Sequence, residues 1–389
     1  MPDLVATIAR KKVKVKNIDL FSYVLSLQFK CSNCMLLPMN TAVVTKKETK
    51  LPDPISRAEK RRLAEADTRT RVTLSFYRYV RIDNPEAFRT LLVEKWGSLD
   101  CMGRIYVASE GINAQMSVPK ENWDKFDAWI RSQPELRGVP YKIAVEEGSG
   151  PSFIKLIVRV KDKIVADGLD DDSFDVTNVG EYLTAAEMND YVNDPDAIVV
   201  DMRNSYESEV GHFEGAITPD VETFRDELKV TPETLRIHKN KKIALYCTGG
   251  IRCEKASAWL KHNGFENVKH LKGGIIDYAH QVQQQGLENK FKGKNFVFDE
   301  RLGERVGNGV ISTCHICKSE PSDTHHHCPS PICYGLFIGC AKCIEKRNGY
   351  CSNKCRVFDS VPEKPKKKLT RLFNDHIQSK RVFKKVRVR

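Results

Sequence analysis

The sequence has no apolar run that approaches the roughly 18 consecutive residues of a membrane span. The stretch NIDLFSYVLSLQF, residues 17–29, follows a basic run as the core of a signal sequence would. Asp19 and the serines interrupt it, however, and no clear small-residue cleavage site follows. These absences argue against a membrane protein and against export, and we expect a cytoplasmic protein that does not bind membranes.

Three further features are missing. The chain has no internal repeat and no glycine-rich dinucleotide fingerprint, and no paired histidine and carboxylate spacing clearly marks a non-haem iron site. The residues themselves therefore do not indicate a nicotinamide cofactor or a mononuclear iron centre.

Negative charge is scarce at both ends of the chain, although the whole chain carries a net charge of +12. Residues 1–70 carry +7 and residues 356–389 carry +9, whereas residues 71–355 carry −4. Basic tails attract phosphate backbones through counterion release, but solvated, disordered ends have the same composition. We expect a poorly ordered basic extension over 1–70, apart from a short helix at 57–66, and a basic tail over 357–389.

Residues 71–160 predict a small α+β domain. Strand-like and helix-like segments follow one another in the order βαββαβ(β), with a hairpin at Gly111. This order suits an antiparallel, ferredoxin-like sheet with its helices on one face. The acidic stretch 161–185 is typical of a linker.

From 186 to 290, strands alternate with helices, which predicts a parallel sheet covered on both faces. The overall fold class is therefore a multidomain mixture of α+β and α/β.

Cys247 ends the buried strand 241–247 and opens the loop TGGI, which leads to Arg252 and a helix. Adjacent glycines let several backbone N–H groups point at one place, and the helix N-terminus adds partial positive charge. We expect Arg252 to add a full positive charge. A thiol in this setting has a low pKa and is nucleophilic. A buried structural cysteine is the competing interpretation. The candidate loop consists of Cys247, Thr248, Gly249, Gly250, Ile251 and Arg252.

Residues 187–290 resemble a rhodanese domain. The segment VVDMRNSYESEVGHFEGAI matches the first motif of that family, YCTGGIRC its active-site loop, and HLKGGIIDY its closing glycine motif. The resemblance implies that Cys247 carries sulfur as a persulfide. Cysteine-dependent phosphatases have a similar loop that is one residue longer, so this loop fits a sulfur adduct better than a phosphate.

The order of the segments resembles a more particular family. ASEGINAQ in the first domain, YCTGGIRCEKASA in the second and LFIGCAKC near the C-terminus are similar to bacterial rhodanese-containing tRNA uridine hydroxylases. The resemblance covers about 71–357. It implies a ferredoxin- or acylphosphatase-like first domain, a tRNA partner rather than DNA, and oxygen-dependent formation of 5-hydroxyuridine at the wobble position, with molecular oxygen as co-substrate.

Two other functions stay open. One is a persulfide sulfurtransferase that acts on tRNA or on a protein. The other is a non-catalytic docking module, against which the intact Cys247 loop argues. Cys253 is an accessory thiol that either resolves a persulfide or packs in the core. His212 is expected to be structural.

Of the 13 cysteines, eight lie in a Cys-rich module at 304–356. These eight cysteines form four closely spaced pairs, which are typical of structural zinc, and eight thiolates supply two four-thiolate sites. A redox thiol cluster or an iron–sulfur site is the alternative, and the spacing leaves sequential and interleaved pairing open. The run of histidines at 325–327 is typical of a solvated loop. A lone CxxC at Cys31 and Cys34 is weak evidence for metal. The expected ligands are Cys314, Cys317, Cys328, Cys333, Cys340, Cys343, Cys351 and Cys355.

Overall fold

The structure is a computed structural model that describes residues 55–146, 150–170, 173–362, 365–366 and 370. Most of the expected basic extension and tail, together with Cys31 and Cys34, lies outside the described residues. The helix expected at 57–66 is confirmed as α2 (Arg57–Ala66), whose N-terminus is capped by the Ser56 side chain accepting from the Glu59 N–H.

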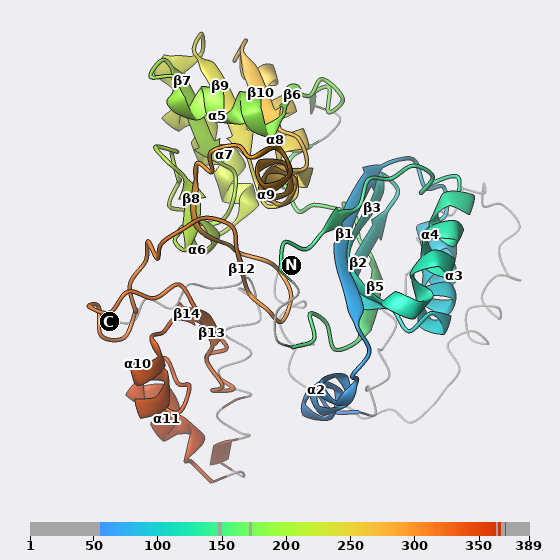
Figure 1. Cartoon of the computed structure of the whole chain (residues 1–389), viewed down its shortest axis with the longest axis vertical. Coiled ribbons are helices and arrows are strands. Elements are labelled where there is room, and N and C mark those ends of the chain that lie inside the picture. Colours follow the sequence, from blue (N-terminus) through green and yellow to red (C-terminus); the bar gives the residue numbers. More distant parts are fainter. Residues whose placement is uncertain (1–54, 147–149, 171–172, 363–364, 367–369, 371–389) are drawn as a thin grey trace, which may run out of the picture. The chain divides into compact units, whose positions relative to one another are not determined.

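The first domain is built on a five-stranded sheet in the order β4-β1-β3-β2-β5 (Figure 1). Four strands follow the ferredoxin-like pattern, and the edge strand β5 pairs parallel with β2, so the sheet is mixed rather than wholly antiparallel. Helices α3 and α4 cover one face (Figure 1). The elements are β1 (Arg71–Tyr79), α3 (Pro85–Ser98), β2 (Met102–Ala108), β3 (Gly111–Pro119), η3 (Lys120–Asn122), α4 (Trp123–Ser132), β4 (Lys142–Ile143) and β5 (Leu156–Val160).

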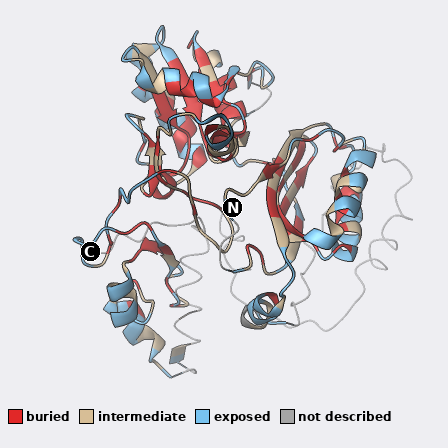
Figure 2. Cartoon of the chain, viewed as in Figure 1, coloured by how far each residue is buried: buried red, intermediate tan, exposed pale blue. Residues whose placement is uncertain are grey.

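Alternation along the strands separates the two faces of this sheet. Phe76, Ile105 and Met116 are buried in one core cluster with Trp96 of α3 and Phe126 of α4. In Figure 2 the strands of this sheet are largely buried, whereas the outer sides of its helices are exposed. The strand residues that alternate with the buried ones form the opposite, half-buried face, which we call the polar sheet face. Its members lie in two rows across the sheet: Tyr77, Asn113 and Tyr106, then Ser75, Gln115 and Arg104.

The second domain has a parallel sheet in the order β6-β10-β9-β7, as predicted. Helices α7 and α8 pack on one face and α5 and α9 on the other, each with its own apolar core. The elements are β6 (Glu181–Leu183), α5 (Ala185–Asn193), β7 (Ala197–Asp201), α6 (Ser205–Ser208), α7 (Phe224–Thr234), η5 (Arg236–His238), β9 (Lys242–Tyr246), α8 (Ile251–His262), β10 (Val268–Leu271) and α9 (Gly274–Gln285). A smaller sheet joins β8 (Gly211–Phe213), β11 (Phe291–Asn295) and β12 (Glu304–Arg305).

The stretch with a linker-like composition is structured in part. β6 lies inside 161–185 and forms an edge of the parallel sheet. Ile164, Asp167 and Phe174 are buried. The acidic composition of this stretch does not predict these contacts, because a buried aspartate is unexpected there. Asp167 can be buried because it is paired with two lysines, Lys163 and Lys255.

The Cys-rich module contains the hairpin β13 (His325–His327) and β14 (Leu336–Ile338), followed by α10 (Ala341–Lys346) and α11 (Asn353–Asp359). The interpretation of the histidine run as a solvated loop is wrong, because these residues form β13 and His325 is buried against the Phe296 ring. Strand β14 also joins the second domain, since Leu336 and Ile338 pack in one cluster with Tyr206.

Candidate active site

Cys247 lies between β9 and α8, at the carboxyl edge of the parallel sheet. The chain turns sharply here because Gly250 has a φ of 95°, in the left-handed region that glycine tolerates. This conformation directs the Gly250 N–H at the Cys247 sulfur, with an N···S distance of 3.1 Å. The structure thus has the strand–loop–helix geometry that the sequence predicts for a thiolate.

The closing glycine motif holds the loop from behind. The N–H groups of Ile275 and Ile276 donate to the carbonyl oxygens of Cys247 and Thr248, at 3.0 and 3.2 Å. A Cβ on Gly274 would lie 2.5 Å from the Cys247 oxygen, so no larger residue fits at this point. The third sequence motif is therefore the support of the active-site loop.

Arg252 has a second role beside the electrostatic one that its sequence position suggested. Its guanidinium makes a bidentate ion pair with Glu207, with N···O distances of 2.6 and 2.8 Å, and donates to the Thr248 hydroxyl at 3.3 Å. The Glu207 carboxylate offsets part of the positive charge expected beside the sulfur, but the charge of Arg252 still acts on Cys247 and lowers its pKa. Arg252 also anchors the loop to α6.

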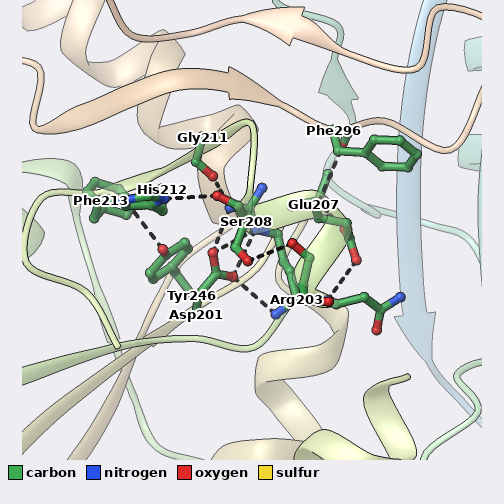
Figure 3. A network of polar contacts seen from close by, with 12 residues as sticks. Asp201, Arg203, Glu207, Ser208, Gly211, His212, Phe213, Tyr246 and Phe296 are labelled. Carbon is green, nitrogen blue, oxygen red and sulfur yellow. Dashed lines mark hydrogen bonds and ion pairs between the residues drawn. The ribbon is translucent and has the colours of Figure 1, made fainter. Parts of the chain in front are cut away.

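The first sequence motif forms the network drawn in Figure 3. Arg203 is completely buried, pairs with Asp201 at 2.6 Å and donates to the Gly211 carbonyl at 2.5 Å. His212 contacts the Ser208 carbonyl through Nδ1 at 2.8 Å (Figure 3), consistent with the structural role expected of it. The network fixes α6, and with it the Glu207 carboxylate that holds Arg252.

The thiol of Cys247 is acidic in this environment. Burial alone raises its pKa, but a hydrogen bond from Cys253, the charge of Arg252 and the backbone N–H groups of Arg252 and Gly250 outweigh burial and lower the pKa to about 6. Cys253 is itself buried in the core with Ala256 and Leu260, and its pKa is raised well above the ordinary value. Cys253 therefore both packs in the core and acts as the thiol donor to Cys247.

This acidity predicts how alkylation of Cys247 depends on pH. Because its pKa is lowered from 9.0 to about 6, its iodoacetamide reactivity should rise between about pH 5 and pH 7 and then level off. The shift also makes the folded state more stable as the pH rises from about 6 to about 9, a gain that is lost as the pH falls through 6. Peptide mass spectrometry after timed alkylation measures the profile. Cys101 is the control, because burial raises its pKa to about 12, and it should stay unreactive. A Cys247 profile still rising at pH 9 would contradict the assignment.

A cavity of about 2720 Å³ lies in front of the loop. Cys247, Thr248, Gly249 and Arg252 line it on one side, and the polar sheet face of the first domain lines it on another. Tyr77 lies close to the loop, since its hydroxyl donates to Glu254 at 2.8 Å and would be 3.0 Å from a Cβ on Gly250. The site is therefore shared by two domains.

The sequence motifs give no sign of this first-domain contribution. Tyr77 and Lys142 belong to strands of nine and two residues that look like ordinary strands in the sequence, and they meet the loop only through the tertiary fold. Glu207 lies in the first sequence motif, but the motif does not predict its pairing with Arg252. The only sequence signal for this pair is that two oppositely charged residues belong to motifs expected at the same edge of the sheet.

The eight cysteines of the module form two separate groups. In each, the four sulfurs lie within 4.8 Å of one another, close enough to hold a metal ion. The pairs alternate along the chain, which settles the pairing in favour of the interleaved arrangement. One group is Cys314, Cys317, Cys340 and Cys343, and the other is Cys328, Cys333, Cys351 and Cys355.

Comparisons with known proteins agree with these three parts. Residues 71–164 match the model of the UPF0176 acylphosphatase like domain, 184–281 the rhodanese-like domain and 292–356 the Rhodanase C-terminal region. In the part of the chain that the structure describes, no helix is long and apolar enough to cross a membrane. The fold and the loop thus define a rhodanese-domain protein with an acylphosphatase-like domain before it and a cysteine module after it.

Curated relatives make the assignment more particular. The tRNA uridine(34) hydroxylase of Leptospira interrogans is 51% identical over 329 residues, which cover 85% of this chain and 88% of that protein. Those of Cronobacter sakazakii and of an Escherichia coli O17:K52:H18 strain are 50% and 52% identical, over 82% and 75% of this chain and 91% and 83% of theirs. The chain belongs to the tRNA uridine(34) hydroxylase family, an enzyme family, which confirms the resemblance seen in its motifs.

Proposed function

We propose that this chain hydroxylates C5 of uridine 34 in tRNA, the wobble position, with molecular oxygen as co-substrate, and that the reaction depends on Cys247. The identity of about 51% to hydroxylases over most of the chain carries the proposal. We place the reaction in the cytoplasm.

The cavity supports an RNA substrate whose base is turned out of its stack. Enzymes that modify a base commonly extrude it into a pocket, where aromatic side chains stack on the ring and amides read its edge. The polar sheet face offers Tyr106 for stacking, and the Gln115 amide matches the O4 acceptor and N3–H donor of uracil. Both side chains are half-buried and line the same cavity as Cys247.

A sulfurtransferase is the second candidate, and the loop geometry favours it. The Gly250 N–H directed at the Cys247 sulfur would also stabilise an anionic persulfide on that atom. The reaction would then transfer sulfur to tRNA or to a protein acceptor.

Nucleosides from bulk tRNA distinguish these two functions. A strain that lacks this protein should lose a uridine derivative heavier by one oxygen, and the intact chain should restore it when supplied on a plasmid. Liquid chromatography with mass spectrometry measures both, and the other modified nucleosides of the same digest are the control. Loss of a thiolated nucleoside instead would favour sulfur transfer to tRNA, and an unchanged profile would contradict both hydroxylation and sulfur transfer to tRNA.

We also propose that each cysteine group holds one structural zinc ion. Four thiolates in a compact group match tetrahedral Zn²⁺, for which Zn–S distances are about 2.3 Å. The apolar cluster of the module contains cysteines, Phe337 and a few half-buried side chains, which is a small core for its length. Bound metal would supply the missing stability of this module.

A further inference from the structure

Lys142 is a buried lysine on the wall of the cavity. It lies in β4 of the first domain and is only 4% exposed. Its Cδ would be 3.6 Å from a Cβ on Gly249, so its side chain reaches across to the active-site loop. Its ammonium nitrogen is 4.7 Å from the centre of the Tyr77 ring, a cation–π contact. The first domain therefore places a cation beside the loop of the second domain.

This ammonium differs from the other deeply buried cations of the described chain. Lys255 is paired with Glu110 and Asp167, and Arg203 with Asp201. Among the described residues, Lys142 has no side-chain hydrogen bond or ion pair, although it lines the cavity. A buried cation is costly unless an anion or a hydrogen-bond acceptor compensates it. The geometry therefore points to an acceptor that arrives with the substrate.

The groups facing Lys142 come from several elements. Burial lowers its pKa, while Asp277 of α9, Cys247 and Glu254 of α8 act in the opposite direction. Tyr77 of β1 supplies the ring beneath it. These neighbours favour the charged ammonium without occupying its hydrogen-bonding positions.

We propose that the ammonium of Lys142 donates a hydrogen bond to O4 of the substrate uracil and so holds nucleotide 34 against the Cys247 loop. This inference rests on the proposed function and names the contact by which the site recognises its base. When a nucleophile adds to C6 of uracil, the electron pair of the C5=C6 π bond moves to C5 and is delocalised onto O4 as an enolate. A cation at O4 therefore stabilises negative charge that develops during reaction at C5, besides binding the ground state.

The position of Lys142 favours a base oxygen over an RNA phosphate. Phosphates stay hydrated and are usually bound by exposed basic side chains at the rim of a site. Lys142 is buried, beside the loop and against an aromatic ring, where a flat base fits. A phosphate contact is nevertheless the alternative that the experiment must separate.

The test uses the full-length chain and anticodon stem-loop RNA with uridine at position 34. Lys142→Met should lower kcat/KM for hydroxylation by about 10- to 100-fold, the effect of one lost charge-assisted hydrogen bond. Because O4 gains charge during the reaction, kcat should fall as well as the affinity. Lys142→Arg should recover part of the loss. Lys125→Met, on exposed α4 across the first-domain sheet, is the matched control and should behave as wild type.

A second RNA, with a pyrimidin-2-one nucleoside that lacks O4 at position 34, separates the two acceptors. Removal of O4 should weaken binding to wild type by a larger factor than it weakens binding to Lys142→Met, because in the variant one of the proposed partners of O4 is already missing. If Lys142→Met binds both RNAs more weakly than wild type by the same factor, the lost contact is with a phosphate and the proposal is overturned. Hydroxylation by Lys142→Met with the kinetics of wild type would also overturn it. Thermal melting, with Lys142→Gln as a second neutral variant, verifies folding. If wild-type protein binds the RNA with O4 more tightly than the RNA without it but hydroxylates neither, the proposed function is refuted while the contact between Lys142 and O4 is still supported.

Discussion

Cys247→Ser is expected to abolish modification of tRNA while the protein stays folded. A serine hydroxyl remains neutral at a pH where the Cys247 thiol, with a pKa of about 6, is a thiolate, and it cannot carry a sulfur adduct. We expect the rate of hydroxylation to fall by a factor of at least about 1000, as for other essential nucleophiles. Single-turnover assays on anticodon stem-loop RNA measure the rate, and nucleoside analysis of cells that carry only the variant measures its effect in vivo.

Cys253 provides the matched control for this substitution. Cys253→Ser keeps a donor beside the Cys247 sulfur and should be much milder, whereas Cys253→Ala removes the donor and should raise the pKa of Cys247. Normal 5-hydroxyuridine in cells with only Cys247→Ser would show that the loop thiol is not part of the reaction. Equal losses for Cys247→Ser and Cys253→Ser would instead show that the two thiols act as a pair.

Removal of metal from the Cys-rich module is expected to have the second large effect. Purified reduced protein should contain two zinc ions per chain, one for each cysteine group. Structural zinc contributes roughly 10–16 kcal/mol to the folding of small zinc-finger peptides, as much as the whole stability of many domains. Chelation should therefore make residues 314–355 sensitive to protease. Elemental analysis and limited proteolysis measure the two effects.

Single cysteine substitutions make this test specific. Cys340→Ala and Cys328→Ala each disrupt a different group and should each release zinc, while Cys101→Ala lies in the first-domain core and should retain both ions. Activity should also fall, because β14 packs on Tyr206, the neighbour of the Glu207 that anchors Arg252. Zinc-free protein with full protease resistance would contradict the metal assignment. Iron with visible absorbance would place an oxygen-reactive centre in this module.

The parts of the site that the sequence predicts are those formed by neighbouring residues. The loop from Cys247 to Arg252 is one turn between a strand and a helix, so its glycines and its helix start already fix the direction of its N–H groups. The alternation of strands and helices in the second domain likewise predicts its parallel sheet, because each element shows its own periodicity.

The parts that could not be predicted depend on residues far apart in the chain. Glu207 and Arg252 are 45 residues apart, and their ion pair changes the charge beside the sulfur. Lys142 enters the site from another domain, through a strand of two residues. The cysteine spacing allowed two pairings, and the path of the chain through β13 and β14 determines which sulfurs meet.

The interleaved cysteine groups also determine when this protein can finish folding during synthesis. The first group needs Cys343 and the second needs Cys355, so neither metal site can close while the ribosome is still translating the first half of the module. The two preceding domains have cores of their own and can form earlier. A nascent chain that is released before residue 355 would carry at most one complete site and an unsupported β14 against Tyr206. If the groups hold zinc as proposed, the second site can capture its metal only after Cys355 has been synthesised.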